Sequence, residues 1–584
     1  MRTNRLLLAS TMTLTLFLVT TVCLDALAQD PGLNQRHGIR RVLLVSIDGM
    51  HAVDYLNCSQ GVSGVNGGQP YCPNLAKLGQ TAVNYLDTST SRPSDSFPGL
   101  TTIVSGATPR LHGAFYDVAY DRVLAPPQNT TGNGLLGGPC TPNQPNGTST
   151  EYEEGIDKNQ TFLNGIDGIS TKNGDGGINS IDPTRLERDP FNNCAPVYPW
   201  NFIRANTIFG VVHAARGYTA WSDKHPAYSS VAGPGDGTNL DDYYSPEINS
   251  TVVALSGINT VLGLACDPIP DPTADLSAWT NSFKNIQCYD TLKVNAILNE
   301  IDGYNHNRSK KTQVPTIFGM NFQAVSVGQK LIEANVGSGG YSDAAGTPSS
   351  LLLGEIQFVD AAIGQWTAEL QKQGLTDSTL VIITAKHGQS PIDSQRYTGI
   401  TATGPVMTSP SMLIDSCLPA SESNSGGQIG PTEDDVSLLW LSSTCTTTSQ
   451  VQILETQSPA TSNIAGIGQI FFGQSINQLF NPPGIPPNGD SRTPDILVTP
   501  NVGVTYSGST KKQAEHGGFA HDDTNVMILV SNPSIPSNTL TIPVLTAQIA
   551  PTILEALGLN PSTLQAVQQQ GTQVLPGIFP IKKK

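Results

Sequence analysis

Four short stretches of the chain carry side chains that could do chemistry, and each lies at the end of an apolar run or at the expected start of a helix or strand. The groups are Asp48, Ser96, the pair Lys386–His387, and His516. Carboxylate and imidazole groups are ligands of divalent metal ions. A serine hydroxyl at a helix N-terminus can attack phosphorus, while the backbone N–H groups there receive the phosphate oxygens. The combination predicts metal-assisted attack on a phosphate-like group.

Lys386 is the unexpected member of this set, because a site for divalent cations normally repels an ammonium group. The other groups also have ordinary structural explanations. An acid after a strand and a serine before Phe-Pro are common helix caps, and a His-Gly pair is common in turns. The functional interpretation therefore depends on several strand ends meeting at one place.

The elements that would bring these groups together are typical of a parallel sheet covered by helices. Residues 40–48 (RRVLLVSID) form one apolar run that ends in an acid, as in a strand buried on both faces. Residues 315–322 and 380–384 predict two further strands. The clearest helix spans residues 349–374, where apolar residues recur at alternating spacings of four and three. In an open parallel sheet, ligands bind beyond the carboxyl ends of the strands, so the residues just after each run are the candidates.

Two further elements are predicted from shorter patterns. Residues 72–86 (CPNLAKLGQTAVNYL) form a helix-like stretch, and a strand at 524–531 with a helix near 545–557 should close the sheet. Two segments, at about 121–195 and 389–435, lose regular periodicity and are expected to be loop-rich insertions.

The expected fold class is therefore α/β, with a mostly parallel central sheet sandwiched by helices. We expect a signal peptide at residues 1–28, one catalytic domain at 38–562 that contains both insertions, and a C-terminal tail at 563–584.

The first 28 residues have the pattern of a signal peptide. Arg2 and Arg5 precede an apolar stretch, and Ala26-Leu27-Ala28 forms a small-residue cleavage pattern. An uncleaved membrane anchor is the alternative, although the stretch is short and broken by threonines. No later segment is long and apolar enough to cross a bilayer. We therefore expect an exported mature protein, secreted or periplasmic, with no membrane span.

Cysteine usage agrees with export. Cys23 would leave with the signal peptide, and eight of the nine cysteines would remain, an even number in a compartment that permits disulfides. Eight cysteines allow about 105 connectivities. The simplest one pairs sequence neighbours: Cys58 with Cys72, Cys140 with Cys194, Cys266 with Cys288, and Cys417 with Cys445.

The charge of the chain excludes some partners. A formal net charge of -16 at pH 7 repels DNA and anionic membranes at long range. We therefore expect no nucleic-acid binding, and the expected partner is a small phosphate ester substrate.

The strand-end groups, taken in order, resemble a known family pattern. Asp-Gly after the first strand, Ser-Phe-Pro, a His-Gly after a late strand and a final His-Gly are similar to the motifs of the type I phosphodiesterase/nucleotide pyrophosphatase family, in the alkaline phosphatase superfamily. The likeness runs from about residue 40 to 560. It implies an alkaline phosphatase-like fold, hydrolysis of phosphate esters, and two metal ions, usually zinc, around a Thr or Ser nucleophile. By this resemblance Asp48, Ser96 and His387 would hold one ion, and His516 would belong to the other.

The chain departs from the family in its ligand set. The family has Asp directly before the late-strand His, where this chain has Lys386. It also has a Pro-Asp-x-x-Gly-His motif after a middle strand, whose best counterpart here begins at Asn321. Gln323 then replaces the Asp and Val327 replaces the His. Three ligands of a two-ion set are therefore missing.

These losses suggest a hypothesis for Lys386. We expect one divalent ion rather than two, zinc by the family's usage, with Ser96 as the nucleophile and Lys386 as a catalytic cation that replaces the missing charge. The losses fall on one ion more than on the other, which favours an active hydrolase over decay. Five further residues are predicted to contact the substrate: Gly99, His225, Asn321, Gln323 and His521.

Three alternatives remain open. The protein could be a one-metal hydrolase similar to the sulfatases, or a degenerate protein that binds ligands without turnover. A structural or adhesive exported protein is suggested only by the loop-rich composition, and it leaves the strand-end groups unexplained. Nucleotide, lipid headgroup, phosphomonoester and sulfate ester all remain candidate substrates.

Overall fold

The computed structural model describes residues 38–131, 134–152, 181–246, 248, 260–261, 264–265, 280–400, 408–421, 432–456, 465–506 and 511–579. The expected signal peptide lies outside these residues, so it stays a prediction. No helix within the described ranges is both long and apolar enough to span a membrane.

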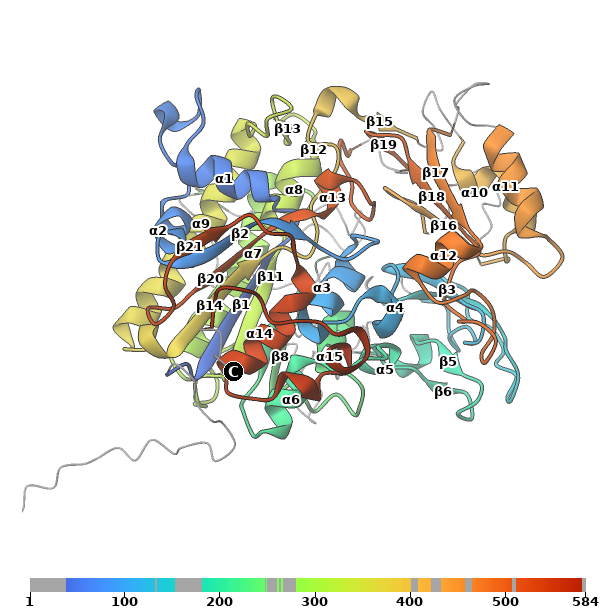
Figure 1. Cartoon of the computed structure of the whole chain (residues 1–584), viewed down its shortest axis with the longest axis horizontal. Helices are drawn as coiled ribbons and strands as arrows, with labels where there is room; N and C mark the ends of the chain where they lie inside the picture. Colours follow the sequence, from blue (N-terminus) through green and yellow to red (C-terminus); the bar gives the residue numbers. More distant parts are fainter. Residues whose placement is uncertain are drawn as a thin grey trace, which may run out of the picture.

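A nine-stranded sheet forms the centre of the described part of the chain (Figure 1). The strands run parallel except β20, which is antiparallel to both of its neighbours, β2 and β14. The expected α/β fold with a mostly parallel sheet is confirmed. In spatial order the strands are β21 (Asn538–Leu540), β2 (Ala82–Ser89), β20 (Asn525–Ser531), β14 (Thr379–Thr384), β1 (Arg41–Ile47), β11 (Ile317–Phe322), β7 (Ala220–Ser222) and β8 (Asp242–Tyr244), with β22 (Val544–Leu545) beside β2.

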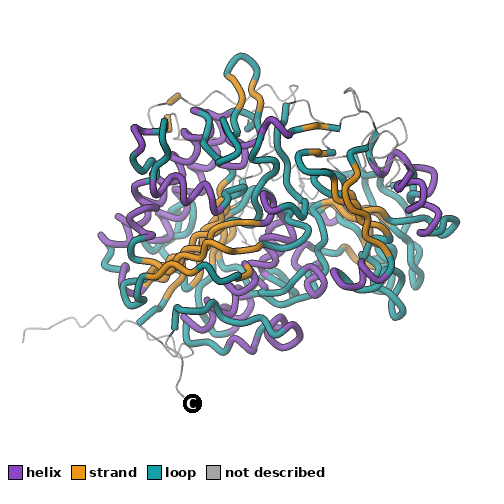
Figure 2. The backbone as a smooth tube through the Cα atoms, turned by 45° about the horizontal axis from the view of Figure 1, so that its top comes forward, coloured by secondary structure: helices purple, strands orange, loops and turns teal. Residues whose placement is uncertain are grey.

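Side chains alternate between the two faces of this sheet, and helices cover both faces (Figure 2). On β1, Val45 and Ile47 pack into one apolar cluster, and Val42 and Leu44 pack into the other. Because both faces are buried, the strands appear in the sequence as unbroken apolar runs. The first face is covered by α1 (Ala52–Gln60), α2 (Pro73–Gly79), α7 (Phe283–Ile301), α8 (Ala324–Lys330) and α9 (Ser350–Lys372). The second is covered by α3 (Ser96–Ser105), α6 (Ile208–Ala214), α14 (Ile549–Ala556) and the 3-10 helix η6 (Pro226–Ala232).

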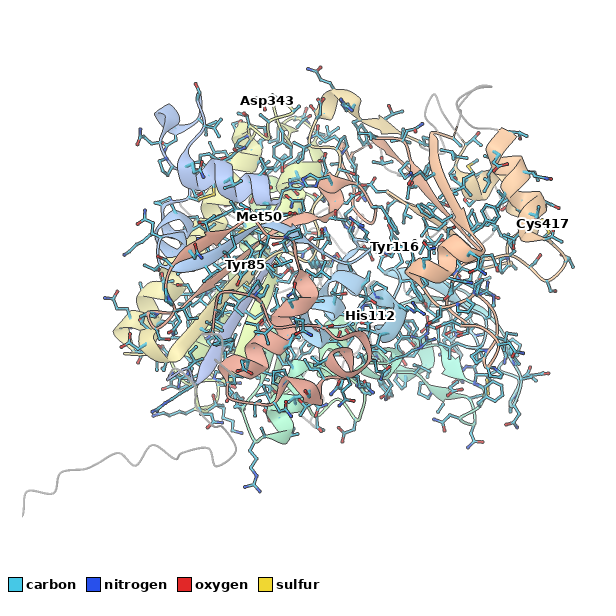
Figure 3. The ribbon with its side chains drawn as sticks, viewed as in Figure 1. Met50, Tyr85, His112, Tyr116, Asp343 and Cys417 are labelled. Atoms are coloured by element: carbon cyan, nitrogen blue, oxygen red, sulfur yellow. A yellow bond between two sulfur atoms is a disulfide. The ribbon has the colours of Figure 1, made fainter. Side chains whose placement is uncertain are left out.

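A second, smaller sheet lies beside the central one, on the right in Figure 1. Its strands are antiparallel, in the order β16 (Ser437–Leu439), β18 (Ile496–Pro500) and β17 (Ile467–Phe472). Around it lie α10 (Pro410–Leu413), α11 (Thr447–Thr456) and α12 (Gln474–Leu479). Tyr116, labelled in Figure 3, packs in one apolar cluster with Val436 and Leu438, and its hydroxyl donates to Asp434 Oδ2 at 2.9 Å. The segment after α3 is thereby tied to the second sheet.

The remaining elements are short. They are α4 (Pro109–His112), α5 (Pro199–Phe202), α13 (His521–Thr524), α15 (Gln565–Gln570), and the strands β3 (Val118–Asp121), β4 (Thr148–Glu151), β5 (Arg188–Asp189), β6 (Ala195–Pro196), β9 (Thr260–Val261), β10 (Leu264–Ala265), β12 (Ile332–Glu333), β13 (Gly337–Ser338), β15 (Thr398–Gly399) and β19 (Val504–Thr505).

Two sequence-based expectations about single elements were wrong. The helix-like stretch at 72–86 is helical only over Pro73–Gly79, and residues 82–86 belong to β2. β2 is paired on both edges, so tertiary pairing outweighs the local helical pattern. The strand predicted at 524–531 exists as β20, but it lies inside the sheet between β2 and β14 and does not close an edge.

The described parts of the first insertion include short strands, and the expected tail is partly buried. Within 121–195 the described residues include β4, β5 and β6, whereas residues 153–180 lie outside the described ranges. In the expected tail, Leu564, Leu575 and Ile578 are buried in the cluster on the second face of the central sheet. The C-terminal segment up to residue 579 therefore contributes to the core.

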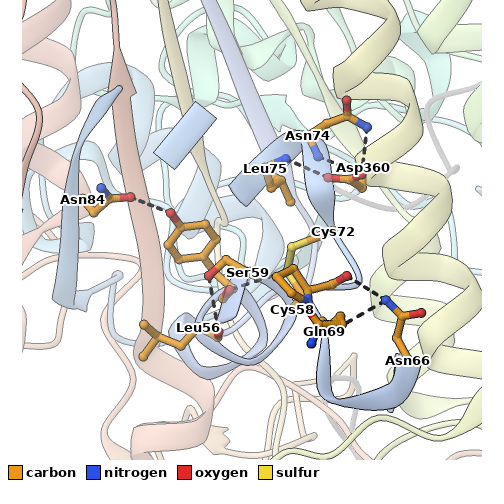
Figure 4. The surroundings of a disulfide bond; sticks show 12 residues. Leu56, Cys58, Ser59, Asn66, Gln69, Cys72, Asn74, Leu75, Asn84 and Asp360 are labelled. Atoms are coloured by element: carbon orange, nitrogen blue, oxygen red, sulfur yellow. Dashed lines mark hydrogen bonds between the residues drawn. A yellow bond between two sulfur atoms is a disulfide. The ribbon is translucent and has the colours of Figure 1, made fainter. Parts of the chain in front are cut away.

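Three of the four expected disulfides are present, namely Cys58–Cys72, Cys140–Cys194 and Cys417–Cys445. Cys288 is disulfide-bonded, and its expected partner Cys266 lies outside the described residues. Figure 4 shows the first bond, which joins the end of α1 to the residue before α2.

We expect mass spectrometry of non-reduced peptides to find these sequence-close pairs in the purified protein. Replacing both Cys58 and Cys72 with serine should lower the free energy of unfolding by about 3 kcal/mol, because the bond closes a loop of 14 residues in the unfolded chain. Four or more free thiols in the mature protein would contradict this prediction.

Candidate active site

The carboxyl ends of adjacent strands bring the predicted side chains together. β1 lies between β11 and β14, and Ser46 on β1 pairs with Asn321 and with Thr384. Asp48, Gln323 and the Lys386–His387 pair follow these positions by two residues or three. Parallel strands therefore deliver all of them to one edge of the sheet.

Asp48 is the centre of this group and is buried, at 1% exposure. Its Oδ2 lies 3.2 Å from Lys386 Nζ and accepts a hydrogen bond of 2.7 Å from Gln323 Nε2. Its Oδ1 lies 2.8 Å from His387 Nε2. Burial alone would raise the pKa of the Asp48 carboxyl, but Lys386 and His387 hold that pKa well below its usual range. Asp48 is therefore a buried carboxylate that stays ionised.

Ser96 is the first residue of α3, and its hydroxyl lies 3.0 Å from His387 Nε2. His387 Nδ1 donates to the carbonyl oxygen of Gly388 at 2.8 Å. Nδ1 therefore carries a proton, and Nε2 is the ring nitrogen that lies close to both Ser96 Oγ and Asp48 Oδ1.

Gly99 allows this approach. A Cβ atom at Gly99 would lie 2.4 Å from the carbonyl oxygen of Lys386, closer than a side chain can come. The first turn of α3 thus packs directly on the backbone at the end of β14. Of the five residues predicted to contact substrate, Gly99 has a clear packing role.

The Lys386 ammonium is fully buried and is held on its second side by Tyr228. Nζ lies 3.4 Å from the Tyr228 hydroxyl and 4.9 Å from the centre of its ring. Phe97, the residue after Ser96, packs edge-on against the same ring at 6.3 Å. Lys386 therefore lies between an anion and an aromatic ring, where a desolvated cation is stabilised.

His516 lies on the other side of His387. The two rings stack with centroids 3.9 Å apart, and His516 Nδ1 lies 3.1 Å from Asp95 Oδ1. Burial, His387 and Lys330 keep the pKa of His516 well below its usual value. His516 therefore adds a neutral imidazole to the group.

The structure places the remaining predicted residues differently. His225 is buried, and its ring stacks on that of Tyr228 at 6.2 Å. Asn321 is buried and donates to Asp223 Oδ1 at 3.3 Å, and Gln323 bonds to Asp48 as described above. His521 is exposed at the start of α13, unlike the buried group.

Two residues of this site were missed by the sequence analysis. Asp95 stands directly before Ser96 and could have been found from that position, since it is the N-cap of α3. Tyr228 is 158 residues away from Lys386 in the chain, and no local pattern marks it.

Three side-chain atoms at this point could serve as ligands of a divalent ion. Asp48 Oδ1, Ser96 Oγ and His387 Nε2 come together, and among the described residues the buried Asp48 Oδ1 has no polar contact besides the one with His387 Nε2. A buried anionic oxygen of this kind is suited to a cation. A second ion would need ligands where Lys386, Gln323 and Val327 stand. Within the described ranges, no group of three or more His, Cys, Asp or Glu side chains could hold a metal ion.

A pair of buried carboxyl groups lies behind His516. Asp435 and Asp523 hydrogen-bond to each other, and Ser390 donates to Asp435 Oδ2 at 2.8 Å. Burial raises the pKa of Asp523 to about 7. The pair therefore shares a proton at mildly acidic pH.

This proton predicts a pH dependence of stability. The unfolded chain loses the Asp523 proton near pH 4, and the folded protein loses it near pH 7. The contribution of this proton to the free energy of unfolding is therefore complete below pH 4 and is lost as the pH rises to 7, a fall of about 2–4 kcal/mol. Asp523→Asn mimics the protonated form and should remove this loss. Thermal unfolding at pH 5 and pH 8 measures it, and parallel pH profiles for wild type and variant would contradict it.

Comparisons with known proteins show what the chain is similar to. The family model described as type I phosphodiesterase / nucleotide pyrophosphatase matches residues 42–152 and 298–410, which include Asp48, Ser96, Gln323 and His387. No curated protein sequence matches the chain.

Two solved structures are similar to the chain at low sequence identity. Alkaline phosphatase PafA is 14% identical with a TM-score of 0.52, over 93% of this chain and 99% of that one. Murine ectonucleotide pyrophosphatase / phosphodiesterase 5 is 13% identical with a TM-score of 0.49, over 89% of this chain and 96% of that one. The likeness to PafA shows that the fold is alkaline phosphatase-like. The match to the family model confirms that the chain resembles the type I phosphodiesterase/nucleotide pyrophosphatase family over residues 42–152 and 298–410.

Proposed function

We propose that this protein is an exported hydrolase of phosphate esters that uses Ser96 as its nucleophile, at most one divalent ion, and Lys386 as a second positive charge. The observation that carries the proposal is the contact of 3.2 Å between Lys386 Nζ and Asp48 Oδ2, next to the Ser96–His387 pair. Lys386 thus contacts the carboxylate that the family uses as a metal ligand.

Ser96 is suited to attack phosphorus. Its hydroxyl lies at the first turn of α3, where backbone N–H groups can receive phosphate oxygens, and contacts His387 Nε2 at 3.0 Å. As the bond from Ser96 Oγ to phosphorus forms, Ser96 releases its proton to solvent and the bond from phosphorus to the leaving oxygen breaks, and that oxygen takes up a proton from solvent. Water then cleaves the phosphoserine ester in a second step.

Asp48, Ser96 and His387 would hold the single ion, which is zinc by the family's usage. When bound, it would lower the pKa of the nucleophile and stabilise negative charge on the phosphoryl oxygens. Gln323 fixes Asp48 Oδ2 by a bond of 2.7 Å, so that Oδ1 stays directed at His387. His516 and Asp95 form the wall on the side of His387.

Lys386 would stabilise the negative charge that develops on the substrate or the leaving oxygen. A fully buried ammonium acts through a low dielectric and is already held in place by Tyr228 and Asp48. Beside two divalent ions it would be repelled, whereas beside one ion and an anionic substrate it would be attracted.

Export is supported by the signal-peptide pattern of residues 1–28 and by the disulfide bonds, which persist in oxidising compartments. The location that fits is secreted or periplasmic.

A substrate panel tests the proposal. Purified protein is assayed with bis(p-nitrophenyl) phosphate, p-nitrophenyl phosphate, ATP and p-nitrophenyl sulfate, before and after dialysis against a chelator and after addition of zinc. Turnover of a phosphate ester is expected. Turnover of the sulfate ester alone would favour the sulfatase-like alternative, and no turnover with any ester would favour the degenerate one.

A further inference from the structure

A buried ion pair on α7 lies directly behind the candidate site. Asp290 Oδ1 and Lys293 Nζ are 3.0 Å apart, one helical turn from each other, and both side chains are fully buried. The free energy needed to remove two charges from water offsets much of their mutual attraction, so a pair of this kind is weak evidence of a purely stabilising role. The contacts of these two side chains with the backbone indicate a further role for the pair.

Both charges bind the backbone at the end of β11. Asp290 Oδ2 accepts the N–H groups of Gln323 and Ala324 at 2.7 and 2.8 Å. Lys293 Nζ donates to the carbonyl oxygen of Asn321 at 2.6 Å. The pair therefore holds the backbone on both sides of Phe322.

These contacts hold the backbone from which the Gln323 side chain extends. Gln323 is the N-cap of α8, and its side chain makes no capping hydrogen bond. Asp290 holds the backbone at this position, because its carboxylate accepts the N–H of Gln323 itself and the N–H of Ala324. The side-chain NH2 group of Gln323 extends from this fixed backbone and donates to Asp48 Oδ2 at 2.7 Å. A chain of contacts runs from α7 through Gln323 to Asp48.

We propose that Asp290 and Lys293 are positioning residues that hold Gln323 against Asp48 and so fix the direction of the Asp48 carboxylate. The effect on turnover rests on the proposed function, whereas the effect on the Gln323–Asp48 contact does not. Displacements of such supporting contacts typically change activity by about 10–100-fold.

The chain contains a matched control for this motif. Asp360 on α9 caps α2 in the same way, since its carboxylate accepts the N–H of Leu75 at 2.7 Å and the N–H of Asn74 at 3.2 Å (Figure 4). Asp360 is buried, like Asp290, but α2 carries none of the residues of the candidate site. A variant here tests what the loss of such a charge does to folding alone.

The experiment compares four proteins with wild type, using the ester that the substrate panel identifies. They are Asp290→Asn/Lys293→Met, Gln323→Leu, the combination of all three changes, and Asp360→Asn. The first two should each lower kcat by about 10–100-fold with KM changed less than about threefold, while circular dichroism stays that of wild type. The triple variant should lose no more than Gln323→Leu, because residues that act through one another are not additive. Asp360→Asn should keep the wild-type kcat.

A conservative variant tests whether a loss of kcat is caused by misfolding. Asp290→Asn/Lys293→Gln keeps a donor for the Asn321 carbonyl and should recover most of the kcat. Wild-type kcat in Asp290→Asn/Lys293→Met, or losses that multiply in the triple variant, would overturn the proposal.

A crystal structure of Asp290→Asn/Lys293→Met separates this inference from the proposed function. Loss of the contact between Gln323 and Asp48 supports the positioning role even if wild type hydrolyses none of the esters, a result that would refute only the function. A contact still near 2.7 Å would overturn the positioning role whatever the activity.

Discussion

Ser96→Ala is expected to reduce phosphate ester hydrolysis by roughly 10,000-fold or more, the scale of loss seen when an enzyme loses its nucleophile. Ser96 Oγ is the hydroxyl that lies 3.0 Å from His387 Nε2 at the first turn of α3. The variant leaves Asp48, Lys386 and His387 in place, so substrate can still bind. Steady-state kinetics should therefore show the loss in kcat.

Folding should be almost unaffected by this change. Removing the Ser96 hydroxyl gives up one side-chain hydrogen bond, worth about 1 kcal/mol. Ser105→Ala is the matched control, because Ser105 is a buried serine at the other end of the same helix, whose hydroxyl donates to the Thr101 carbonyl oxygen at 2.6 Å. It should keep wild-type kcat and similar thermal stability.

The covalent step can be observed directly. Wild type mixed with substrate and quenched in acid should carry phosphate on the peptide that contains Ser96, and Ser96→Ala should carry none. Unchanged turnover in Ser96→Ala would mean that water attacks phosphorus directly or that another serine is the nucleophile.

The parts of this site that the sequence revealed are those whose signals are local. An apolar run followed by Asp48 predicted the end of β1, and the run before Lys386 predicted the end of β14, because a strand buried on both faces contains few polar residues. The long helix α9 was found within one or two residues of its ends, since its spacing of apolar residues is regular over 23 residues.

The parts that were missed depend on contacts between distant segments. Tyr228, which holds Lys386, comes from η6, and the Asp290–Lys293 pair that binds the end of β11 comes from α7. In the sequence, Asp290 and Lys293 look like an ordinary surface pair one turn apart on a helix. Only tertiary packing shows that both are buried.

The second sheet was missed for a related reason. β16 has three residues and β18 has five, too short to show a period of two convincingly. Both also follow loop-rich sequence, and β16 comes directly after the second predicted insertion. The strand β20 was found, but its position inside the sheet was not, because order and direction are set by pairing with β2 and β14.

Lys386 is the residue that best distinguishes an active site with an altered ligand set from a degenerate site without turnover. Decay leaves a lysine at a strand end without partners, or moves it to solvent. Here the ammonium is fully buried, between Asp48 Oδ2 at 3.2 Å and the Tyr228 hydroxyl at 3.4 Å. Removing the ammonium from water costs free energy that the ion pair with Asp48 hardly offsets, so stability alone gives little reason to keep the charge. A catalytic role would give such a reason.

Lys386→Ala is therefore expected to lower kcat by about 100–1,000-fold, the usual effect of removing one group that stabilises charge in a transition state. It should also lower the free energy of unfolding by about 3–5 kcal/mol, because Asp48 keeps its charge in the interior and loses its cation. Activity is normalised to folded protein. Lys372→Ala is the control, since Lys372 is 70% exposed on α9 and pairs only with Glu369 among the described residues; it should change neither quantity.

Metal analysis of carefully purified protein completes the test, because Lys386 can replace an ion only if fewer than two ions are bound. Wild type is expected to contain no more than one divalent ion per chain. Lys386→Asp puts a carboxylate where the family has one and removes the repulsion between the ammonium and an added ion, so its metal content should rise above that of wild type. Two ions per chain in wild type, or full activity in Lys386→Ala, would show that Lys386 is not a catalytic cation.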